Sequence, residues 1–329
     1  MADLVKNRHE IVFIYDVKDG NPNGDPMDEN KPRMDETTGL NVVSDVRLKR
    51  TIRDYFRSAK SDVFINGEAI TATKRATNIL GEDPTKMNPE KISIVSNTLL
   101  EKFIDLRLFG GTLAFKSGKR DGDSSDNDNK KKKKEKGIKS ITYTGPVQFR
   151  FGKSLHKVDP VFIQGTAAFT KDEESGQRSF SEKWQLPYSC IAYYGIINQN
   201  TAKETLLTDA DVDFLFEAMW DGTKDLITRS KMEQLPRLLI DVVYEDEKNF
   251  HIGELDKAIE LKSELEEERI RGVKDFVLEI SELKGLLGKY GNSIKKVRYR
   301  IDPRLKLTLN GEPFEIEGLL EGKTEKLEK

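Results

Sequence analysis

The sequence predicts an α+β fold whose elements follow in the order strand, helix, strand, strand, helix, strand. Apolar, β-branched runs at residues 11–15, 145–151, 188–197 and 236–244 are typical of buried strands. Residues 46–57 and the segment that Thr208 opens carry apolar residues at helical spacing. Clusters of Gly, Asn, Asp and Pro separate these segments. This order is that of a ferredoxin-like fold with inserted segments.

The first strand leads into a loop, residues 16–26, that consists almost wholly of turn-forming residues. Ser44 and Asp45 then offer an N-cap to a helix over residues 46–57. One side of this helix is apolar, and most of the remainder is basic, through Arg47, Lys49, Arg50, Arg53 and Arg57. Cations in a first turn oppose the helix dipole, and a bound polyanion would offset that cost. The basic side is therefore either a solvated face or a phosphate-binding surface.

Further elements follow along the chain. A helix is expected over residues 92–108 with a stop at Gly110, and a strand over 158–169. A β-hairpin follows, with its tip at 171–176 and its far arm over 178–184. Thr208 and Asp211 form a capping box, and Gly222 is expected to close the helix that it opens. The tail predicts a helix over 255–271, a strand over 273–280, a helix over 281–289 and a strand over 294–301.

Residues 116–139 form a low-complexity segment in which four aspartates precede the lysine run of residues 130–134. So few apolar side chains cannot offset the entropy of ordering, which predicts a mobile loop. The lysines suggest a nucleic-acid contact, but the adjacent acidic block competes for them, and a solvated insertion is the alternative.

Composition limits the classes of function. Charged residues make up 34% of the 329 residues, yet the net charge is only −2, so any nucleic-acid surface requires basic groups segregated on one face. The single cysteine, Cys190, excludes an internal disulfide and is expected to be a buried thiol. No apolar run has the length of a membrane span or of a signal peptide, which predicts a cytoplasmic protein.

No set of residues predicts a metal site or a catalytic centre. Asp19, Asn21, Asn23 and Gly24 match the first positions of a calcium-binding loop, but residue 30 is Asn where a glutamate is required. The loop is better explained by backbone shape, since Gly and Asn tolerate left-handed conformations. The three histidines lie outside metal-ligand spacing of one another and of Cys190, so no cofactor is expected.

The loop and the basic helix, together with residues 105–111, 145–149 and 228–231, resemble a known family in their order along the chain. They are similar to the RNA-binding backbone subunit of the CRISPR Cascade complex, a member of the RAMP superfamily, and more narrowly to its type I-B version. The resemblance implies one domain over 1–329, with an RNA-recognition-like palm and a fingers insertion over about 60–140. It also implies a thumb hairpin over about 165–187 and a C-terminal extension of the palm over 250–329.

The resemblance implies a non-catalytic role. Copies of the subunit would stack along one CRISPR RNA and present it for pairing with target DNA, beside the large subunit, the subunit that binds the 5′ handle and the processing endonuclease. A protein that holds any guide sequence should grip phosphates and leave base edges free. The candidate RNA-binding residues are Arg47, Lys49, Arg50, Arg53, Asn21, Asn23, Gly24, Arg229, Ser230, Lys231, Arg178 and Trp184.

Some alternatives stay open. Trp184 is equally compatible with a core position, and residues 229–231 with an ordinary surface turn. A metal-dependent endoribonuclease of the same superfamily would use an aspartate such as Asp45, Asp54 or Asp62. A self-assembling structural protein without nucleic acid is the second rival.

Overall fold

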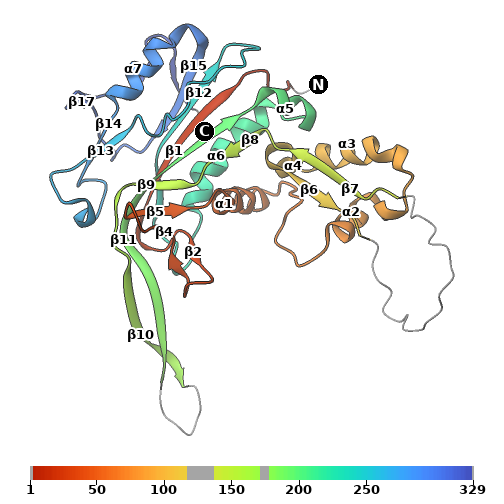
Figure 1. The fold of residues 1–329 in the computed structure, drawn as a ribbon, viewed down its shortest axis with the longest axis horizontal. Coiled ribbons are helices and arrows are strands. Elements are labelled where there is room, and N and C mark those ends of the chain that lie inside the picture. The colour runs from red at the N-terminus through yellow and green to blue at the C-terminus, as the bar shows by residue number, and fades with distance from the viewer. Residues whose placement is uncertain (1–2, 117–136, 171–177, 328–329) are drawn as a thin grey trace. The chain divides into compact units, whose positions relative to one another are not determined.

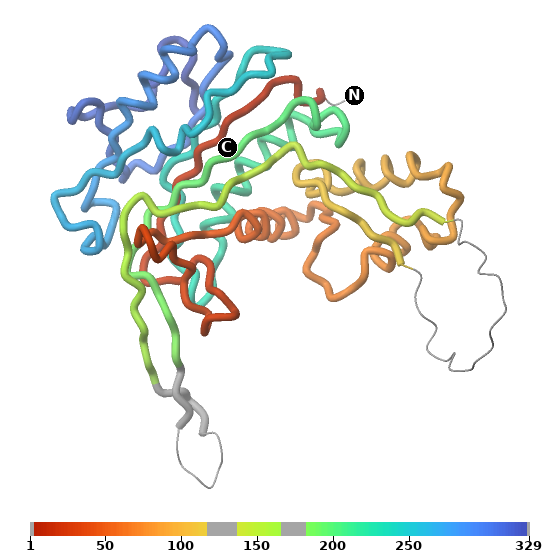
Figure 2. Tube along the Cα trace, viewed as in Figure 1, coloured from red at the N-terminus to blue at the C-terminus, as the bar shows by residue number. Residues whose placement is uncertain are grey.

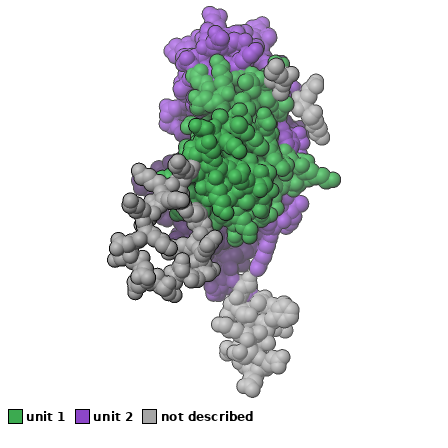
Figure 3. Space-filling model, turned by 90° about the vertical axis from the view of Figure 1, so that its right-hand side faces the viewer, with its two compact units in different colours: residues 1–5, 56–146, 200–212 green, residues 6–55, 147–199, 213–329 purple. Residues whose placement is uncertain are grey.

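The computed structural model describes residues 3–116, 137–170 and 178–327. The chain divides into two compact units, which Figure 3 distinguishes by colour. The first comprises residues 1–5, 56–146 and 200–212, and the second residues 6–55, 147–199 and 213–329. Most of the low-complexity segment, residues 117–136, lies outside the described residues, as does the expected hairpin tip.

The second unit contains a ten-stranded sheet whose main path runs β18-β15-β12-β1-β11-β9-β5-β4, with β8 and β10 also paired to β11 (Figure 1). All its pairings are antiparallel except β15 with β18. Its strands are β1 (His9–Gly20), β4 (Met34–Asp35), β5 (Leu40–Val43), β8 (Val147–Phe149), β9 (Gly152–Lys157), β10 (Val161–Thr170), β11 (Arg178–Ile197), β12 (Gln234–Tyr244), β15 (Ile294–Ile301) and β18 (Thr324–Lys326).

Two helices interrupt the central strands along the chain, as the trace in Figure 2 shows. Helix α1 (Asp45–Ser58) follows β1, and α6 (Asp209–Lys224) lies between β11 and β12. In the sheet, β1 lies between β12 and β11, and β9 lies beyond β11. The mixed α and β fold that the sequence predicts is therefore confirmed.

The central strands β1 and β12 are buried on both of their faces. Arg298 and Arg300 of β15 lie over the rings of Phe216 and Trp220, so α6 covers one face. On the other face, Val12 and Ile14 belong to an apolar core that also contains residues of α7 (Ser281–Lys289). A strand buried on both sides explains why the sequence of β1 is a continuous apolar run rather than an alternating one.

Helix α6 begins as predicted but ends later. Its capping box forms, because Thr208 N donates to Asp211 Oδ2 at 3.1 Å and Asp211 N donates to Thr208 Oγ1 at 3.2 Å. The prediction that Gly222 closes the helix is wrong, since the helix continues to Lys224. A Cβ at position 222 would lie 2.9 Å from Tyr55 Cβ, so this glycine allows α6 to approach α1 closely.

Strand β11 is a single strand of 20 residues, where the sequence predicted two separate segments. It pairs with β10 as far as Gln185 and with β1 from Leu186 onward. Pro187 lies at this change of partner, opposite Asp19, and no pair forms there. A proline is tolerated at such an interruption because no ladder hydrogen bond needs its missing N–H. Together, β10 and β11 project from the sheet as a long hairpin (Figure 1).

The C-terminal part of the second unit carries a separate four-stranded sheet in the order β13-β14-β16-β17. The predicted helix over residues 255–271 is wrong, because residues 260–262 instead form a strand against β14. Leu255, Ala258 and Ile259 are buried at helix-like spacing, but Leu265 is 46% exposed and no apolar stripe continues. Strand pairing thus overrides helix propensity. The strands are β13 (Glu260–Lys262), β14 (Val277–Glu279), β16 (Leu307–Leu309) and β17 (Glu312–Phe314).

The first unit is mainly helical, with one two-stranded sheet. The predicted helix over 92–108 is two helices, because Phe103 adopts an extended conformation and stacks edge-on against Phe64. Residues 72–80 form a further helix that was not predicted, capped by Thr71 and closed by Gly81 at a φ of 74°. The elements are α2 (Ala72–Leu80), α3 (Ile92–Lys102), α4 (Ile104–Phe109), β6 (Gly110–Ala114), β7 (Ser140–Thr144) and α5 (Gln199–Thr205).

Candidate nucleic-acid interface

The glycine-rich loop that follows β1 is fastened to the start of α1. Asn23 Oδ1 accepts hydrogen bonds from both Ser44 N and Ser44 Oγ, each at 2.8 Å. Ser44 Oγ in turn accepts from Arg47 N at 3.3 Å, which makes Ser44 the predicted N-cap. Leu48, Ile52 and Phe56 are buried as the apolar stripe predicts. The loop and the first turn of the helix therefore form one connected structure.

The basic residues of α1 differ in their surroundings. Lys49 forms an ion pair with Asp45 at 2.9 Å, and the exposed Arg50 forms one with Asp54 at 2.9 Å. Arg53 is half-buried. Arg47 is also half-buried, and its guanidinium donates to Thr51 Oγ1 at 3.0 Å. The side expected to be mostly basic is thus partly neutralised by the carboxylates of the same helix.

Arg47 and Lys231 form the most distinctive part of the surface. Burial lowers the pKa of Lys231, and the nearby Arg47 charge lowers it further. Burial also lowers the pKa of Arg47. Within the described part of the chain, neither cation lies at ion-pair distance from a carboxylate. Two such cations, partly withdrawn from water, would bind an anion more strongly than two fully solvated ones.

Asn21 connects Lys231 to the loop. The backbone oxygen of Asn21 accepts from Lys231 Nζ at 2.9 Å, and its backbone nitrogen donates to Ser230 O at 2.7 Å. Its side-chain Nδ2 donates to Asn30 O at 2.6 Å. The structure therefore brings Asn21, Ser230, Lys231 and Arg47 together, although 210 positions separate Asn21 from Lys231.

Gly24 and Arg229 lie in the two chain segments that contribute to this set, the loop after β1 and the turn before β12. A Cβ at position 24 would lie 2.0 Å from Asn30 Oδ1, so the turn requires glycine there. Arg229 is exposed and lies in the same turn as Lys231. This turn is closed by a hydrogen bond from Lys231 N to Thr228 O at 3.1 Å.

Sequence reasoning missed the aromatic side chains behind Arg47. The ring of Tyr15 stacks on that of Tyr193, with centroids 6.2 Å apart, and Tyr193 Oη donates to Ser44 O at 3.0 Å. Burial raises the pKa of both tyrosines, so both stay neutral hydroxyls. The alternation along β1 places Tyr15 on the same face as Phe13, and this is the signal that could have identified it.

Of the two candidate residues in the hairpin, Trp184 has a described side chain and Arg178 does not. Arg178 begins β11, and its side chain lies outside the described residues. Trp184 is half-buried rather than a core residue. Its ring lies 5.1 Å from that of Phe162, and Lys31 Nζ lies 5.4 Å from its centroid. A partly exposed aromatic pair with a lysine is a surface on which a base could stack.

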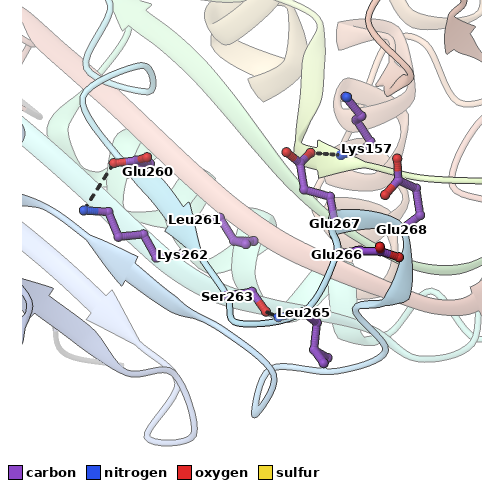
Figure 4. Close-up of a pocket in the computed structure, with 9 residues that line it drawn as sticks. All are labelled: Lys157, Glu260, Leu261, Lys262, Ser263, Leu265, Glu266, Glu267 and Glu268. Carbon is purple, nitrogen blue, oxygen red and sulfur yellow. Dashed lines mark hydrogen bonds and ion pairs between the residues drawn. The ribbon is translucent and has the colours of Figure 1, made fainter.

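A pocket of about 620 Å³ lies in the second unit, between the end of β9 and residues 260–268 (Figure 4). Four glutamates and two lysines line it, and Glu267 accepts from Lys157 N at 2.6 Å. Its acidic lining would repel a phosphate backbone, so it is not part of the candidate interface.

Other predicted features can be placed as well. Cys190 is fully buried, as predicted, and burial raises the pKa of its thiol. Across residues 3–116, 137–170 and 178–327, no group of three or more His, Cys, Asp or Glu side chains could hold a metal ion. In the same residues, no helix combines the length and apolar character needed to cross a membrane.

A mixed α and β fold with a half-buried basic set beside a glycine-rich loop defines a candidate phosphate-binding protein. Residues 7–281 match the family model of the CRISPR-associated protein Cas7. A CRISPR-associated protein Cas7 from Haloferax volcanii is 34% identical over 313 residues, which cover 93% of this chain and 90% of the relative. The chain belongs to the Cas7 family.

Two solved structures also resemble this chain. A chain of a CRISPR RNA-guided surveillance complex aligns at a TM-score of 0.47 and 14% identity, covering 89% of this chain and 88% of that one. A chain of a CRISPR RNA-guided surveillance complex in a pre-nicking state aligns at a TM-score of 0.48 and 12% identity, covering 92% and 96%.

Proposed function

We propose that this Cas7-family protein is the non-catalytic backbone subunit of a type I-B-like Cascade complex. The subunit binds the phosphates of the CRISPR RNA. Copies of the chain assemble along one guide RNA, next to the other Cascade subunits, and leave the guide bases free to pair with target DNA. Family membership supports this role, and the set around Arg47 and Lys231 supplies a surface suited to it.

The proposal is carried by two half-buried cations, Arg47 and Lys231. They lie near each other, and neither has a carboxylate at ion-pair distance in the described part of the chain. Lys49 and Arg50 already have acidic partners, so a phosphate would have to compete for them. Among the described residues, Arg47 and Lys231 have no carboxylate at ion-pair distance, and Asp54 acts on Arg47 only at longer range. They are also held in place, Arg47 by Thr51 and Lys231 by Asn21 O. Preorganised cations lose little conformational freedom on binding.

The remaining parts of the fold have roles in this proposal. The sheet of the second unit, with β1, α1, β9, β11, α6 and β12 in a ferredoxin-like order, is the RNA-recognition-like palm. The hairpin of β10 and β11 is the thumb, and Trp184 lies near its base. The first unit forms the fingers, and the sheet of β13, β14, β16 and β17 extends the palm at the C-terminal side.

The candidate aspartates support the non-catalytic part of the proposal. Asp45 and Asp54 each lie 2.9 Å from a cation of α1, and Asp62 lies 4.0 Å from Lys102. Carboxylates engaged in this way are poorly placed to bind a catalytic metal ion together.

The proposal is tested by RNA affinity across a salt series for a variant that combines Arg47→Gln and Lys231→Gln. Each single-strand phosphate contact contributes about 0.7 to the slope of log affinity against log salt, so the double variant should flatten this slope by about 1.4. Unrelated RNA sequences should lose affinity equally, because phosphates carry no sequence information.

A matched control removes the same charge elsewhere, through Arg269→Gln and Lys262→Gln. These residues are exposed and paired with Glu266 and Glu260, beyond β12. The control should keep the wild-type slope. A double variant of Arg47 and Lys231 that is folded and keeps the wild-type slope would contradict the proposal.

A further inference from the structure

Asn21 has one polar atom that the protein leaves without a partner. Its backbone nitrogen, backbone oxygen and side-chain Nδ2 all form hydrogen bonds, to Ser230 O, Lys231 Nζ and Asn30 O. Its side-chain Oδ1 is buried and has no partner among the described residues. The residue as a whole is only 1% exposed. Buried polar atoms of this kind nearly always have a hydrogen-bond partner, from the protein, from ordered water or from a ligand.

The orientation of the amide is fixed by its surroundings. Nδ2 lies 2.6 Å from the carbonyl oxygen of Asn30, and rotation of the amide would place two oxygens against each other. Oδ1 is therefore an acceptor, and the missing partner is a hydrogen-bond donor.

The neighbouring cations point to the class of molecule that supplies the donor. Lys231 Nζ lies 2.9 Å from the backbone oxygen of the same residue, and Arg47 is close enough to depress the pKa of Lys231. Both cations favour a phosphate backbone. The phosphate and ring oxygens of such a backbone only accept hydrogen bonds, and its one donor outside the bases is the ribose 2′-hydroxyl.

We propose that Asn21 Oδ1 accepts a hydrogen bond from a 2′-hydroxyl of the RNA that Arg47 and Lys231 hold, so that Asn21 selects RNA over DNA. The inference rests on the proposed function and names a specificity residue for it. A contact to the sugar distinguishes the two nucleic acids without reading the base, as a holder of arbitrary guide sequences requires.

The hydroxyl reaches Oδ1 through a shift of the turn that follows Asn21. Residues 26–30 of this turn are exposed, and Met27 is 92% exposed. This shift leaves the bond from Nδ2 to Asn30 O in place, so the amide keeps the orientation in which Oδ1 accepts. Gln185 Oε1 is a second buried acceptor without a partner among the described residues. Gln185 precedes Leu186, which pairs with Gly20, the residue before Asn21.

The test compares uridine oligomers with ribose, 2′-deoxyribose or 2′-fluororibose sugars, bound to wild type and to Asn21→Ala. The fluorine matches the hydroxyl in size but cannot donate a hydrogen bond. Wild type should prefer the ribose oligomer over both others, and Asn21→Ala should reduce this preference about fivefold, the effect of one ordinary hydrogen bond. Asn21→Asp keeps an acceptor oxygen and should retain the preference despite weaker binding overall.

Asn30→Gly is the matched control, because it removes a neighbouring amide side chain and keeps the backbone carbonyl that Asn21 contacts. Glycine also adopts the left-handed φ of 57° that Asn30 has. It should leave the preference unchanged. If Asn21→Ala weakens binding of all three oligomers equally, Asn21 is only structural and the inference fails. If Asn21→Ala does not fold, equal wild-type affinity for ribose and 2′-fluoro oligomers still overturns the inference. A salt slope unaffected by loss of Arg47 and Lys231 would instead overturn the proposed function.

Discussion

At the scale of single residues, the surroundings of a charge decide whether it is available for binding. Arg47 and Arg50 lie on the same helix only three positions apart, yet Arg50 pairs with Asp54 and Arg47 has no acidic partner within ion-pair distance in the described chain. Asp54 lies four residues after Arg50, which is the spacing at which helical side chains meet. This competition can be read from the sequence. The approach of Lys231 to Arg47 cannot, because it depends on the path of the whole chain.

Glu279 shows the same principle for an acidic residue and gives a pH prediction. Hydrogen bonds from the Ser281 hydroxyl and from the backbone nitrogen atoms of Gly311 and Ser281 lower its pKa from 4.5 to about 2. A carboxyl whose pKa is lowered by folding contributes stability above the unfolded pKa, and this contribution is lost as the pH falls through the folded pKa. Glu279 therefore stabilises the fold at neutral pH and loses that effect between pH 4.5 and about 2.

The change that tests this is Glu279→Gln. The variant should be less stable than wild type at neutral pH, and the difference should shrink as the pH falls from 4.5 towards 2. Urea denaturation at a series of pH values measures both effects. Glu282→Gln, the same change at an exposed position of the next helix, is the control and should follow wild type. A constant difference between Glu279→Gln and wild type across this range would contradict the assignment.

At the scale of elements, local pattern predicted those segments whose burial is decided locally. Helix α1 has a continuous apolar stripe and a capping serine, and the structure confirms both. Residues 255–271 carry helix-forming residues without a sustained stripe, so pairing with a distant strand decided their conformation. Gly222 was misread, and residues 178–197 were divided into two segments, for a related reason. The role of Gly222 depends on Tyr55, and the continuity of the strand depends on a change of strand partner at Pro187, which no local window contains.

A deletion prediction concerns the lysine-rich segment between β6 and β7. These strands pair from Gly110 with Thr144 to Ala114 with Ser140, and Phe115 N donates to Lys139 O at 2.8 Å. The two ends of the segment are therefore already close, and removal of residues 117–136 leaves a connection of hairpin length. The free energy of unfolding should change by less than about 1 kcal/mol.

RNA affinity of the deletion variant should stay near the wild-type value, because the acidic block beside the lysines competes with phosphates. Thermal melting and RNA titration at one salt concentration measure both quantities. The double variant of Arg47 and Lys231 serves as the reference for a real loss of contacts. A fall in affinity comparable to that reference would assign the lysine run to the interface.

At the scale of the whole molecule, a net charge of −2 means that an RNA-binding surface requires a local group of basic residues. The acidic pocket of residues 260–268 lies beyond β12, whereas Arg47 and Lys231, which have no carboxylate at ion-pair distance among the described residues, lie at the start of α1 and in the turn before β12. Family membership alone does not locate the RNA-binding surface, and we propose that it includes Arg47 and Lys231.

The last prediction separates a passive RNA-binding subunit from a ribonuclease through Asp45. In the passive role, Asp45 only neutralises Lys49, at 2.9 Å, and repels RNA from the helix N-terminus. Asp45→Ala should therefore strengthen RNA binding, and the loss of one negative charge beside Lys49 should steepen the salt slope by up to about 0.7. Asp54→Ala should act in the same direction through Arg50, to a smaller extent because that pair is more exposed.

In the ribonuclease role, the same substitutions would abolish metal-dependent cleavage of RNA. Labelled RNA incubated with wild type, with and without Mg²⁺, should stay intact over times that permit full binding. The two roles thus predict opposite results for one substitution, since Asp45→Ala yields either tighter binding of intact RNA or the loss of a cleavage activity. Cleavage by wild type that requires Mg²⁺ and disappears in Asp45→Ala would replace the passive role with a catalytic one.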